Sequence, residues 1–335
     1  MDVSADKPEE WTTRRRFAET MRCGAPDRVP CFEDGLRDDV LEQWRRQGLP
    51  SGRDVREMVR CDRWQRVPVD LVPRPRVEGW PTSRRGLERL RRRLDPEDPA
   101  RLPDDWPSRV EAWRTRRHVL QLPVHRGFFL SMGVGDWSRF LEVMYLLHDR
   151  PSLVREILDL HGELCARLAE RVLRDVDVDF ATFSEPIGGS DGPLLSPATY
   201  RRVVLRSYRP ILDALRRGGV ETVIFLTYAN ARALLPAVLE AGFDGLWACE
   251  AETGAMDYRS LRRRFGRRLR LIGGIDLDVL LQGKAAIRRE IETKIPPLLA
   301  QGGYVPLADG RVRTNVPLEN YLYYRRLLAE ITGAR

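Results

Sequence analysis

Short apolar runs alternate with stretches of helical periodicity along most of the chain. In the segment 222–257, residues 223–226 are apolar and residues 231–241 carry apolar side chains at helical spacing. The first pattern is typical of a strand buried on both faces of a parallel sheet, and Gly242 is a usual residue at a helix end. Another apolar run follows at 245–249. The pattern therefore predicts two consecutive β-α units.

The same alternation extends over the rest of the chain. Strands are expected at 28–32, 119–129, 179–183, 222–226, 245–249, 270–275 and 304–307, with an eighth within 64–72 or 119–129. Helices are expected at 1–25, 38–47, 84–94, 137–148, 151–174, 198–217, 231–241, 284–300 and 317–331. Alternating strands and helices predict an α/β fold with a parallel sheet. Because no G-x-G-x-x-G turn follows the first strand, a (β/α)8 TIM barrel is favoured over an open doubly wound sheet.

One barrel domain is expected over residues 11–332, preceded by an N-terminal helical extension. Residues 50–117 interrupt the alternation and are rich in proline, arginine and tryptophan. We interpret this stretch as an irregular insertion after the first strand, folded as a tryptophan-packed cap over one end of the barrel. A separate binding module is the alternative interpretation.

Composition narrows the classes of partner. The 335 residues carry a net charge of +8, almost all of it from arginine, and 42% of them are hydrophobic. The arginines alternate with acids on predicted helices, which indicates solvated faces and no nucleic-acid partner. No apolar run of about 18 residues and no apolar leader occur, so we expect no membrane span, no signal peptide and a cytoplasmic location. Five cysteines without C-x-x-C spacing indicate neither a disulfide framework nor a zinc knuckle.

Polar residues follow most of the predicted strands, at the sheet edge where α/β enzymes hold their active sites. The candidates for catalysis are Glu33, Glu185, Glu250 and Asp276. The candidates for substrate binding are Asp34, Arg126, Tyr228, Asn230 and Asp309. Crowded carboxyl groups raise each other's pKa, and such a site suits proton transfer, a cationic ligand or a divalent ion such as Mg²⁺. Helix capping is the alternative role for Glu33, Asp34 and Asp276.

Several motifs resemble the uroporphyrinogen decarboxylase-like superfamily. They are DRVPCFEDG at 27–35, DGPLLSP at 191–197, LIGGID at 271–276, GGYVP at 302–306 and PLENYLYY at 317–324. The resemblance implies a (β/α)8 barrel with its active site in a deep cleft at the strand C-termini, and association as a homodimer. It also implies one of two reactions, which are decarboxylation of a tetrapyrrole and zinc-dependent methyl transfer between a corrinoid and a thiol.

The residues at the family's functional positions differ from both patterns. The decarboxylases carry arginines near the first strand that hold propionate groups, whereas the corresponding stretch here, 31–39, is acidic. Zinc-dependent members carry a His-x-Cys motif and a late cysteine, which fall here on Leu226, Tyr228 and near Gly310. Zinc needs histidine or cysteine ligands, so we expect no zinc and assign no metal ligands.

The sequence therefore predicts a methyltransferase-like member of the superfamily that acts on a small molecule at the barrel mouth. Methyl transfer or related chemistry would use carboxylates without zinc, with a corrinoid as co-substrate and a corrinoid protein as partner. The first alternative is a decarboxylase of a tetrapyrrole or another carboxylated substrate. The second is a non-catalytic barrel that binds a corrinoid or another ligand.

Overall fold

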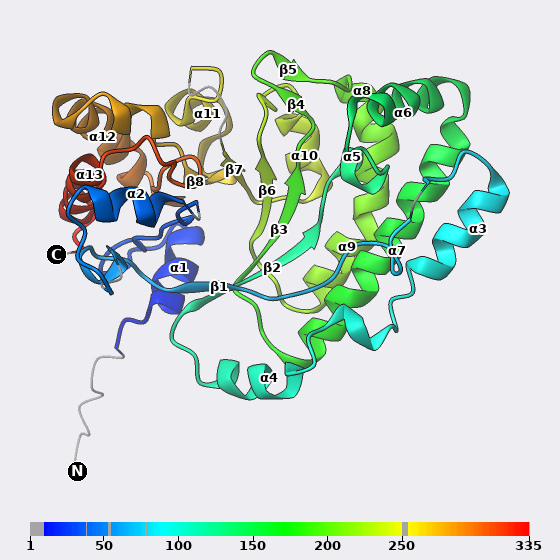
Figure 1. The fold of residues 1–335 in the computed structure, drawn as a ribbon, viewed down its shortest axis with the longest axis horizontal. Coiled ribbons are helices and arrows are strands. Elements are labelled where there is room, and N and C mark those ends of the chain that lie inside the picture. The colour runs from blue at the N-terminus through cyan, green and yellow to red at the C-terminus, as the bar shows by residue number, and fades with distance from the viewer. Residues whose placement is uncertain (1–9, 38, 53–54, 78, 250–253, 335) are drawn as a thin grey trace, which may run out of the picture.

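Seven parallel strands form the central sheet of the computed structural model, which describes residues 10–37, 39–52, 55–77, 79–249 and 254–334 (Figure 1). In their order across the sheet, the strands are β1 (Trp64–Arg66), β2 (Val119–His125), β3 (Phe180–Glu185), β6 (Val223–Thr227), β7 (Gly245–Ala248), β8 (Arg270–Gly273) and β9 (Tyr304–Val305). All neighbours in this sheet pair in parallel. The turn between β3 and the next helix carries a small antiparallel hairpin, β4 (Gly188–Gly189) and β5 (Gly192–Pro193).

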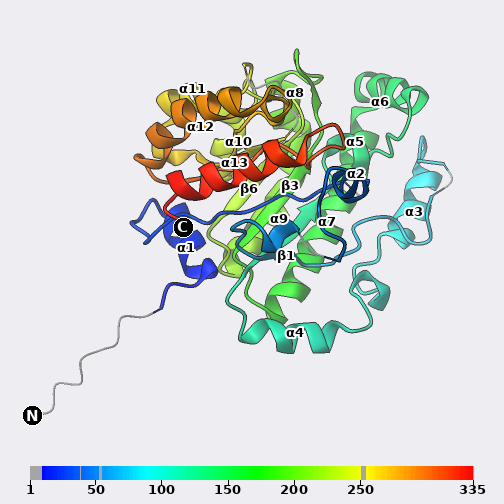
Figure 2. The ribbon, with the colours of Figure 1, turned by 60° about the vertical axis from the view of Figure 1, so that its left-hand side comes forward.

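Helices follow the strands, as the periodicity predicts. The α-helices are α1 (Thr13–Met21), α2 (Val40–Arg46), α3 (Arg84–Arg93), α4 (Trp106–Arg114), α5 (Phe128–Ser131), α6 (Trp137–Asp149), α7 (Pro151–Asp175), α8 (Pro197–Thr199), α9 (Arg206–Arg217), α10 (Leu235–Ala241), α11 (Tyr258–Phe265), α12 (Lys284–Leu299) and α13 (Leu318–Ile331). Shorter turns are the 3-10 helices η1 (Val55–Glu57), η2 (Pro99–Arg101), η4 (Gly266–Arg268) and η5 (Leu277–Leu281), and the π-helix η3 (Tyr200–Leu205). Helices α11, α12 and α13 lie side by side (Figure 2). Among the described residues, no helix is long and apolar enough to span a membrane.

Alternate residues of the strands face a common inner core. This core contains Val119, Phe180, Ile224, Trp247 and Ile272, which come from five different strands. Val305 of β9 and the partly buried Trp64 of β1 belong to the same cluster. Since residues from both edge strands meet in one cluster, the sheet is strongly curled. Helix α1 packs into this core through Phe17, whose ring centroid lies 4.9 Å from that of Phe180.

An extended segment lies between the two edges of the curled sheet. Its Leu36 forms an isolated parallel bridge with Val312, beyond β9, and the Cys31 carbonyl accepts a 2.9 Å hydrogen bond from the Asp62 amide, just before β1. The prediction of a strand at 28–32 is wrong, because Pro30 has no amide hydrogen to donate and only one bridge forms nearby among the described residues. The predicted α/β fold with a parallel sheet is confirmed, and the strand sought within 64–72 is β1.

Part of the predicted insertion 50–117 belongs to the sheet, because β1 lies within it. The rest holds α3 and α4, and the two tryptophans of α4 are buried. Trp106 donates to the Asp175 carboxylate at 2.8 Å and Trp113 to the Gln65 side-chain oxygen at 3.0 Å. These bonds connect α4 to the end of α7 and to β1. The boundaries of a single domain at 11–332 stay a prediction.

Candidate active site

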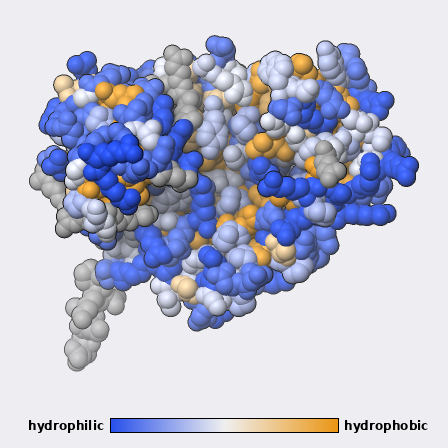
Figure 3. Space-filling model, viewed as in Figure 1, coloured by the Kyte–Doolittle hydropathy of each residue, from blue (hydrophilic) through white to orange (hydrophobic). Residues whose placement is uncertain are grey.

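The face of the molecule in Figure 3 is hollowed between the side that carries α2, α12 and α13 and the side that carries α3, α6 and α7. The carboxyl ends of the strands open on one end of the curled sheet, and we call this end the mouth. Beneath it lies an aromatic floor formed by Phe32, Trp64, Phe180 and Trp247. The ring centroid of Trp64 lies 5.7 Å from that of Trp247, 6.2 Å from that of Phe32 and 6.4 Å from that of Phe180. Phe32, Phe180 and Trp247 are buried in this cluster, and Trp64 packs against it partly exposed.

A chain of polar side chains lies on the inner face above the floor. Arg66 donates to the Asp34 carboxylate at 3.3 Å and to the Gln121 side-chain oxygen at 3.1 Å, and Gln121 donates to the Thr182 hydroxyl at 2.7 Å. Gln121 and Thr182 are buried, whereas 57% of the Arg66 side chain is exposed. The Arg66 guanidinium also lies 5.2 Å from the centroid of the Trp64 ring. This arginine is therefore held in one position with part of its surface open to a ligand.

One donor in the aromatic floor has no partner. The indole nitrogen of Trp247 is buried and makes no hydrogen bond to any residue that the structure describes. Its ring edge lies toward β8, because a methyl group at Gly273 would be 3.4 Å from Trp247 Cδ1. Buried indole N–H groups usually find an acceptor. The floor therefore offers a hydrogen bond that the protein itself leaves unused.

Glu185 ends β3 on the opposite face from this arrangement. It follows Phe183, which packs in the outer core with the helices, and its side chain is fully buried. The Phe128 amide donates to Oε1 at 2.8 Å, and the hydroxyls of Tyr200 and Tyr208 donate to Oε2. Burial raises the pKa of this carboxyl from an ordinary 4.5 to about 7, against the effect of these hydrogen bonds. Glu185 connects β3 to α5, η3 and α9, and its side chain faces these helices and not the inner face of the sheet.

The raised pKa of Glu185 predicts a pH-dependent stability that Glu185→Gln removes. Between pH 4.5 and 7 the unfolded chain loses the proton and the folded chain keeps it, so wild-type stability falls as pH rises. We expect the stability of the wild type relative to Glu185→Gln to fall by about 3 kcal/mol over that interval. Urea unfolding at pH 4.5 and pH 8 measures this difference. A difference that does not change with pH would show that Glu185 titrates normally.

Glu33 is held inside the protein by the C-terminal helix. Its Oε2 accepts a 3.0 Å hydrogen bond from the Tyr321 hydroxyl and lies 3.6 Å from the guanidinium of Arg325. Arg325 is fully buried and also donates to the carbonyls of Phe32 and Arg60, both at 2.6 Å. Burial raises the pKa of Glu33 and the charge of Arg325 opposes that effect. These contacts attach the segment 31–36 to α13.

Asp309 is the predicted residue whose environment most favours proton transfer. It follows Leu307, an inner-core residue, by two positions, and it is 6% exposed. The Leu277 amide donates to Oδ1 at 3.0 Å, and no described residue donates to Oδ2. Burial raises the pKa of Asp309 to about 7, with a further contribution from the charges of Asp276 and Asp278. An acid of this kind exists in both protonation states near neutral pH.

The other predicted residues have diverse positions. Asp276 caps η5 by accepting a 2.9 Å hydrogen bond from the Asp278 amide, which is the capping alternative. Tyr228, after β6, is 45% exposed, and Arg126, after β2, is exposed. The backbone amide of Asn230 donates a 2.9 Å hydrogen bond to the Gly189 carbonyl, which joins this loop to the β4–β5 hairpin. Glu250 lies outside the described residues.

The residues at the family's zinc positions do not fit zinc. Leu226 is buried in the inner core, and Tyr228 has a phenol where a thiolate would stand. Within the described parts of the chain, no three histidine, cysteine, aspartate or glutamate side chains are grouped so as to hold a metal ion. Residues 250–253 lie outside those parts, and the absence of zinc stays a prediction.

Of the eight predicted residues that the structure describes, Asp34 is the one that takes part in the polar chain at the mouth. Arg66, Gln121 and Thr182 were not predicted, because each lies inside a strand and not after it. Their signal in the sequence is the two-residue period of the strand, since each follows an inner-core residue by two positions.

This geometry defines a class of protein, an α/β protein whose curled parallel sheet carries polar groups at its mouth. The family model described as uroporphyrinogen decarboxylase (URO-D) matches residues 130–326, which is more than half of the chain. The chain belongs to the uroporphyrinogen decarboxylase (URO-D) family, and the resemblance of its motifs to that superfamily is confirmed.

Relatives in the family are distant. The chain is 25% identical over 200 residues to the uroporphyrinogen decarboxylase of Legionella pneumophila strain Paris, covering 59% of this chain and 53% of that protein. It is 27% identical over 208 residues to a uroporphyrinogen decarboxylase of Thermus thermophilus, covering 59% and 55% respectively. The chain therefore spans about half the length of the curated relatives it matches.

A solved structure supports the fold over nearly the full length. The methyltransferase from Methanosarcina mazei aligns with a TM-score of 0.58 and covers 95% of this chain and 99% of that one. Sequence identity is 15%, so the likeness shows the fold alone.

Proposed function

We propose that the protein is an enzyme that transfers a methyl group from, or to, a small molecule bound at the mouth, using carboxylates and no zinc. The fold we propose is a (β/α)8 barrel in which residues 31–36 take the place of the eighth strand. The observation that carries the proposal is an arginine held over an aromatic floor at the mouth, supported by a buried aspartate after β9 whose pKa is near 7.

Each feature has a role in the proposed reaction. The floor of Trp64 and Trp247 stacks on a flat apolar part of the substrate, and the free indole N–H donates to an acceptor on it. Arg66, positioned by Asp34 and Gln121, binds an anionic or strongly polar group. Asp309 donates a proton to the oxygen that loses its methyl group, since its protonated form is available near pH 7.

The methyl acceptor in this proposal is a reduced corrinoid supplied as co-substrate, carried by a separate corrinoid protein. The residues at the positions that correspond to the family's zinc ligands cannot hold and activate a thiol. The methyl acceptor therefore has to be a nucleophile without activation by zinc. We further propose a homodimer as the assembly and a cytoplasmic location, with no nucleic-acid partner.

Decarboxylation of a tetrapyrrole or another carboxylated substrate is the second candidate. It is favoured by the family match and by Arg66, which would hold a carboxylate of the substrate. Acidic groups nearby, Asp34 among them, reduce the affinity of the mouth for a molecule with many carboxylates. The third candidate is a non-catalytic barrel, which would bind a corrinoid or another ligand without converting it.

Two assays on the purified protein separate these functions. In the first, reduced cobalamin is mixed with a set of aryl methyl ethers, and formation of methylcobalamin is followed by absorbance. In the second, uroporphyrinogen is supplied and its products are separated after oxidation. Methylcobalamin formation that requires the protein supports the proposal, and loss of carboxyl groups from uroporphyrinogen without methyl transfer overturns it in favour of decarboxylation. Binding without either reaction supports the non-catalytic barrel.

Arg66→Met tests the binding role in whichever assay shows turnover. Since the substitution removes a charge-assisted hydrogen bond to the substrate, we expect KM to rise at least about tenfold, with a smaller change in kcat. Arg63→Met is the matched control, because Arg63 is exposed just before the same strand and outside the polar chain. An unchanged KM in Arg66→Met would remove Arg66 from the site.

A further inference from the structure

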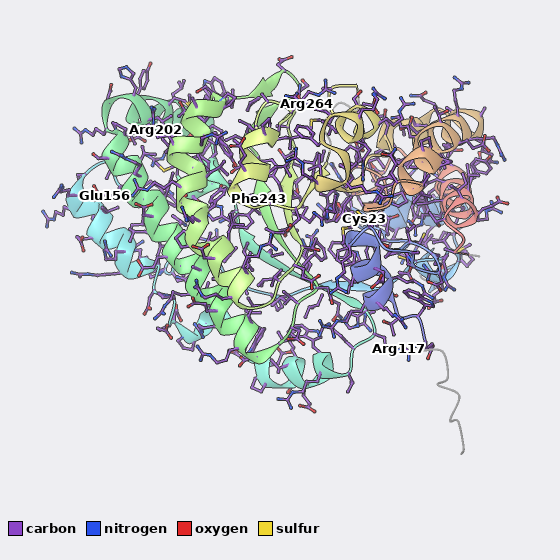
Figure 4. All side chains as sticks on the ribbon, turned by 180° about the vertical axis from the view of Figure 1, so that it is seen from behind. Cys23, Arg117, Glu156, Arg202, Phe243 and Arg264 are labelled. Atoms are coloured by element: carbon purple, nitrogen blue, oxygen red, sulfur yellow. The ribbon has the colours of Figure 1, made fainter. Side chains whose placement is uncertain are left out.

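Cys23 has an unusual backbone conformation at the end of helix α1, where Figure 4 labels it. Its φ is +57°, and among the described residues it is the one non-glycine with a positive φ. The Cys23 amide donates to the Thr20 carbonyl at 3.0 Å, and the Gly24 amide to the Glu19 carbonyl at 2.8 Å. This is the helix-ending pattern in which glycine usually takes the left-handed residue. A side chain there costs on the order of 1 kcal/mol, so a thiol stands where the backbone favours glycine.

The thiol of Cys23 lies beside two arginines. It is partly exposed and packs on Gly302 and Gly303, which come just before β9, at the end of the sheet opposite the mouth. A methyl group at Gly303 would be 2.8 Å from Cys23 Sγ, 3.7 Å from Arg262 Nη1 and 3.6 Å from Arg270 Cγ. The Cys23 sulfur and the Arg262 guanidinium therefore both lie next to the position that a Gly303 side chain would occupy.

Arg262 is a buried cation without a carboxylate partner among the described residues. It is 1% exposed, its Nη2 donates to the Gly303 carbonyl at 3.1 Å, and its Nε and Nη1 make no hydrogen bond to a described residue. The groups that act on its charge are Cys23, Arg267, Arg270 and Tyr304, and burial lowers its pKa. A buried cation without a counter-ion is costly. An anion at Cys23 would offset this cost.

We propose that Cys23 is a modification site that exchanges with small anionic disulfides, and that the positive charge of Arg262 beside it attracts them. In the exchange, Cys23 Sγ gives its proton to solvent and attacks one sulfur of the disulfide. The disulfide bond breaks, one half remains bound to Cys23, and the other half leaves as a thiolate. Cys23 is oxidised to the disulfide level while the leaving half is reduced.

The charges around Cys23 favour an anionic partner. Arg262, Arg267 and Arg270 contribute positive charge from α11, η4 and β8. Glu19 packs on Gly24 and opposes them in part, but it is paired with Arg22 at 3.7 Å.

The remaining cysteines are poor competitors in the folded protein. Cys31, Cys165 and Cys249 are buried. Cys61 is partly exposed, yet burial raises its pKa to about 11, with smaller contributions from Glu33, Cys31 and Asp62 and against the opposing charge of Arg325. Thiolate is the reactive form, so Cys61 should react slowly. Cys61 is therefore an internal control for Cys23.

The test exposes the full-length protein to oxidised glutathione near neutral pH and follows adducts by intact mass and peptide mapping. We expect one glutathione adduct on Cys23, formed at least about tenfold faster than on Cys61. Cys23→Ser should abolish the fast adduct. Reaction of Cys61 first, or of several cysteines at equal rates, would overturn the proposal.

The role of Arg262 has its own variants. Arg262→Gln should slow the adduct on Cys23 about tenfold, and Arg262→Lys should restore much of the rate because it keeps the charge. Where Arg262→Gln does not fold, the wild type is compared with an uncharged disulfide, bis(2-hydroxyethyl) disulfide. For each disulfide, the rate of reaction at Cys23 in the folded protein is divided by the rate in the denatured chain. This ratio should be larger for oxidised glutathione than for the uncharged disulfide. Equal ratios would show that the arginines play no part.

Discussion

Replacing Asp309 by asparagine is expected to lower kcat about 10²- to 10⁴-fold in the assay that shows turnover. The reason is that asparagine keeps the shape and the acceptor for the Leu277 amide but cannot donate the carboxyl proton. In the wild type, kcat/KM should fall above pH about 7, because the acid loses its proton there. The variant should lose that dependence. Rates measured from about pH 5.5 to about pH 9 for both proteins test the two expectations together.

Asp276→Asn is the matched control for this experiment. Asp276 is a neighbouring carboxylate that caps η5, and asparagine caps helices almost as well. We therefore expect its kcat at about pH 5.5 to stay within about threefold of the wild type, while the fall in rate moves to lower pH because the charge of Asp276 contributes to the raised pKa of Asp309. If Asp309→Asn and Asp276→Asn reduced kcat equally, the effect would come from local structure and not from proton transfer.

Replacing Arg325 by methionine is expected to destabilise the protein by about 3–5 kcal/mol. The substitution leaves the carboxyl group of Glu33 buried without its cation, and it removes donors from the carbonyls of Phe32 and Arg60. The segment 31–36, which lies between the two edges of the sheet, loses part of its attachment to α13, and the Tyr321 hydrogen bond to Glu33 remains. Thermal and urea unfolding of the wild type and the variant measure the loss.

Two further variants separate charge from packing in that result. Arg326→Met changes the exposed neighbour on the same helix and should alter the stability by less than about 0.5 kcal/mol. Glu33→Gln combined with Arg325→Met should be more stable than Arg325→Met alone, because no charge is then left buried. If the double variant were no more stable, the lost carbonyl contacts would account for the whole effect.

Local patterns predicted the regular elements well where the chain is buried on both sides. Strand β6 was expected at 222–226 and occurs at Val223–Thr227, and α7 was expected at 151–174 and occurs at Pro151–Asp175. The segment 28–32 was expected as a strand from its apolar residues and is not one. The bridge nearby is made by Leu36, whose partner Val312 beyond β9 lies almost 280 residues further along the chain, and no local pattern reports so distant a pairing.

The candidate site was predicted less completely than the fold. The predicted residues follow strands, and of these Asp34 contacts Arg66 at the mouth, whereas Asp309 is buried with a raised pKa. Glu185 and Glu33 also end extended segments, yet tyrosines and an arginine from distant helices surround them. Successive side chains of a strand point to opposite faces of the sheet. An error of one position in the predicted strand end therefore places the last carboxyl group on the wrong face.

What the sequence by itself determined is the family and the parallel α/β architecture, since these depend on residue types and their order. Only the tertiary structure decided which polar groups meet. Arg66, Asp34 and Gln121 come from three different segments and meet at the mouth. Arg262 lies close to Cys23, although the two are far apart in the sequence. Burial and proximity shift proton affinities and set the cost of an unpaired charge, and both arise from packing between distant segments.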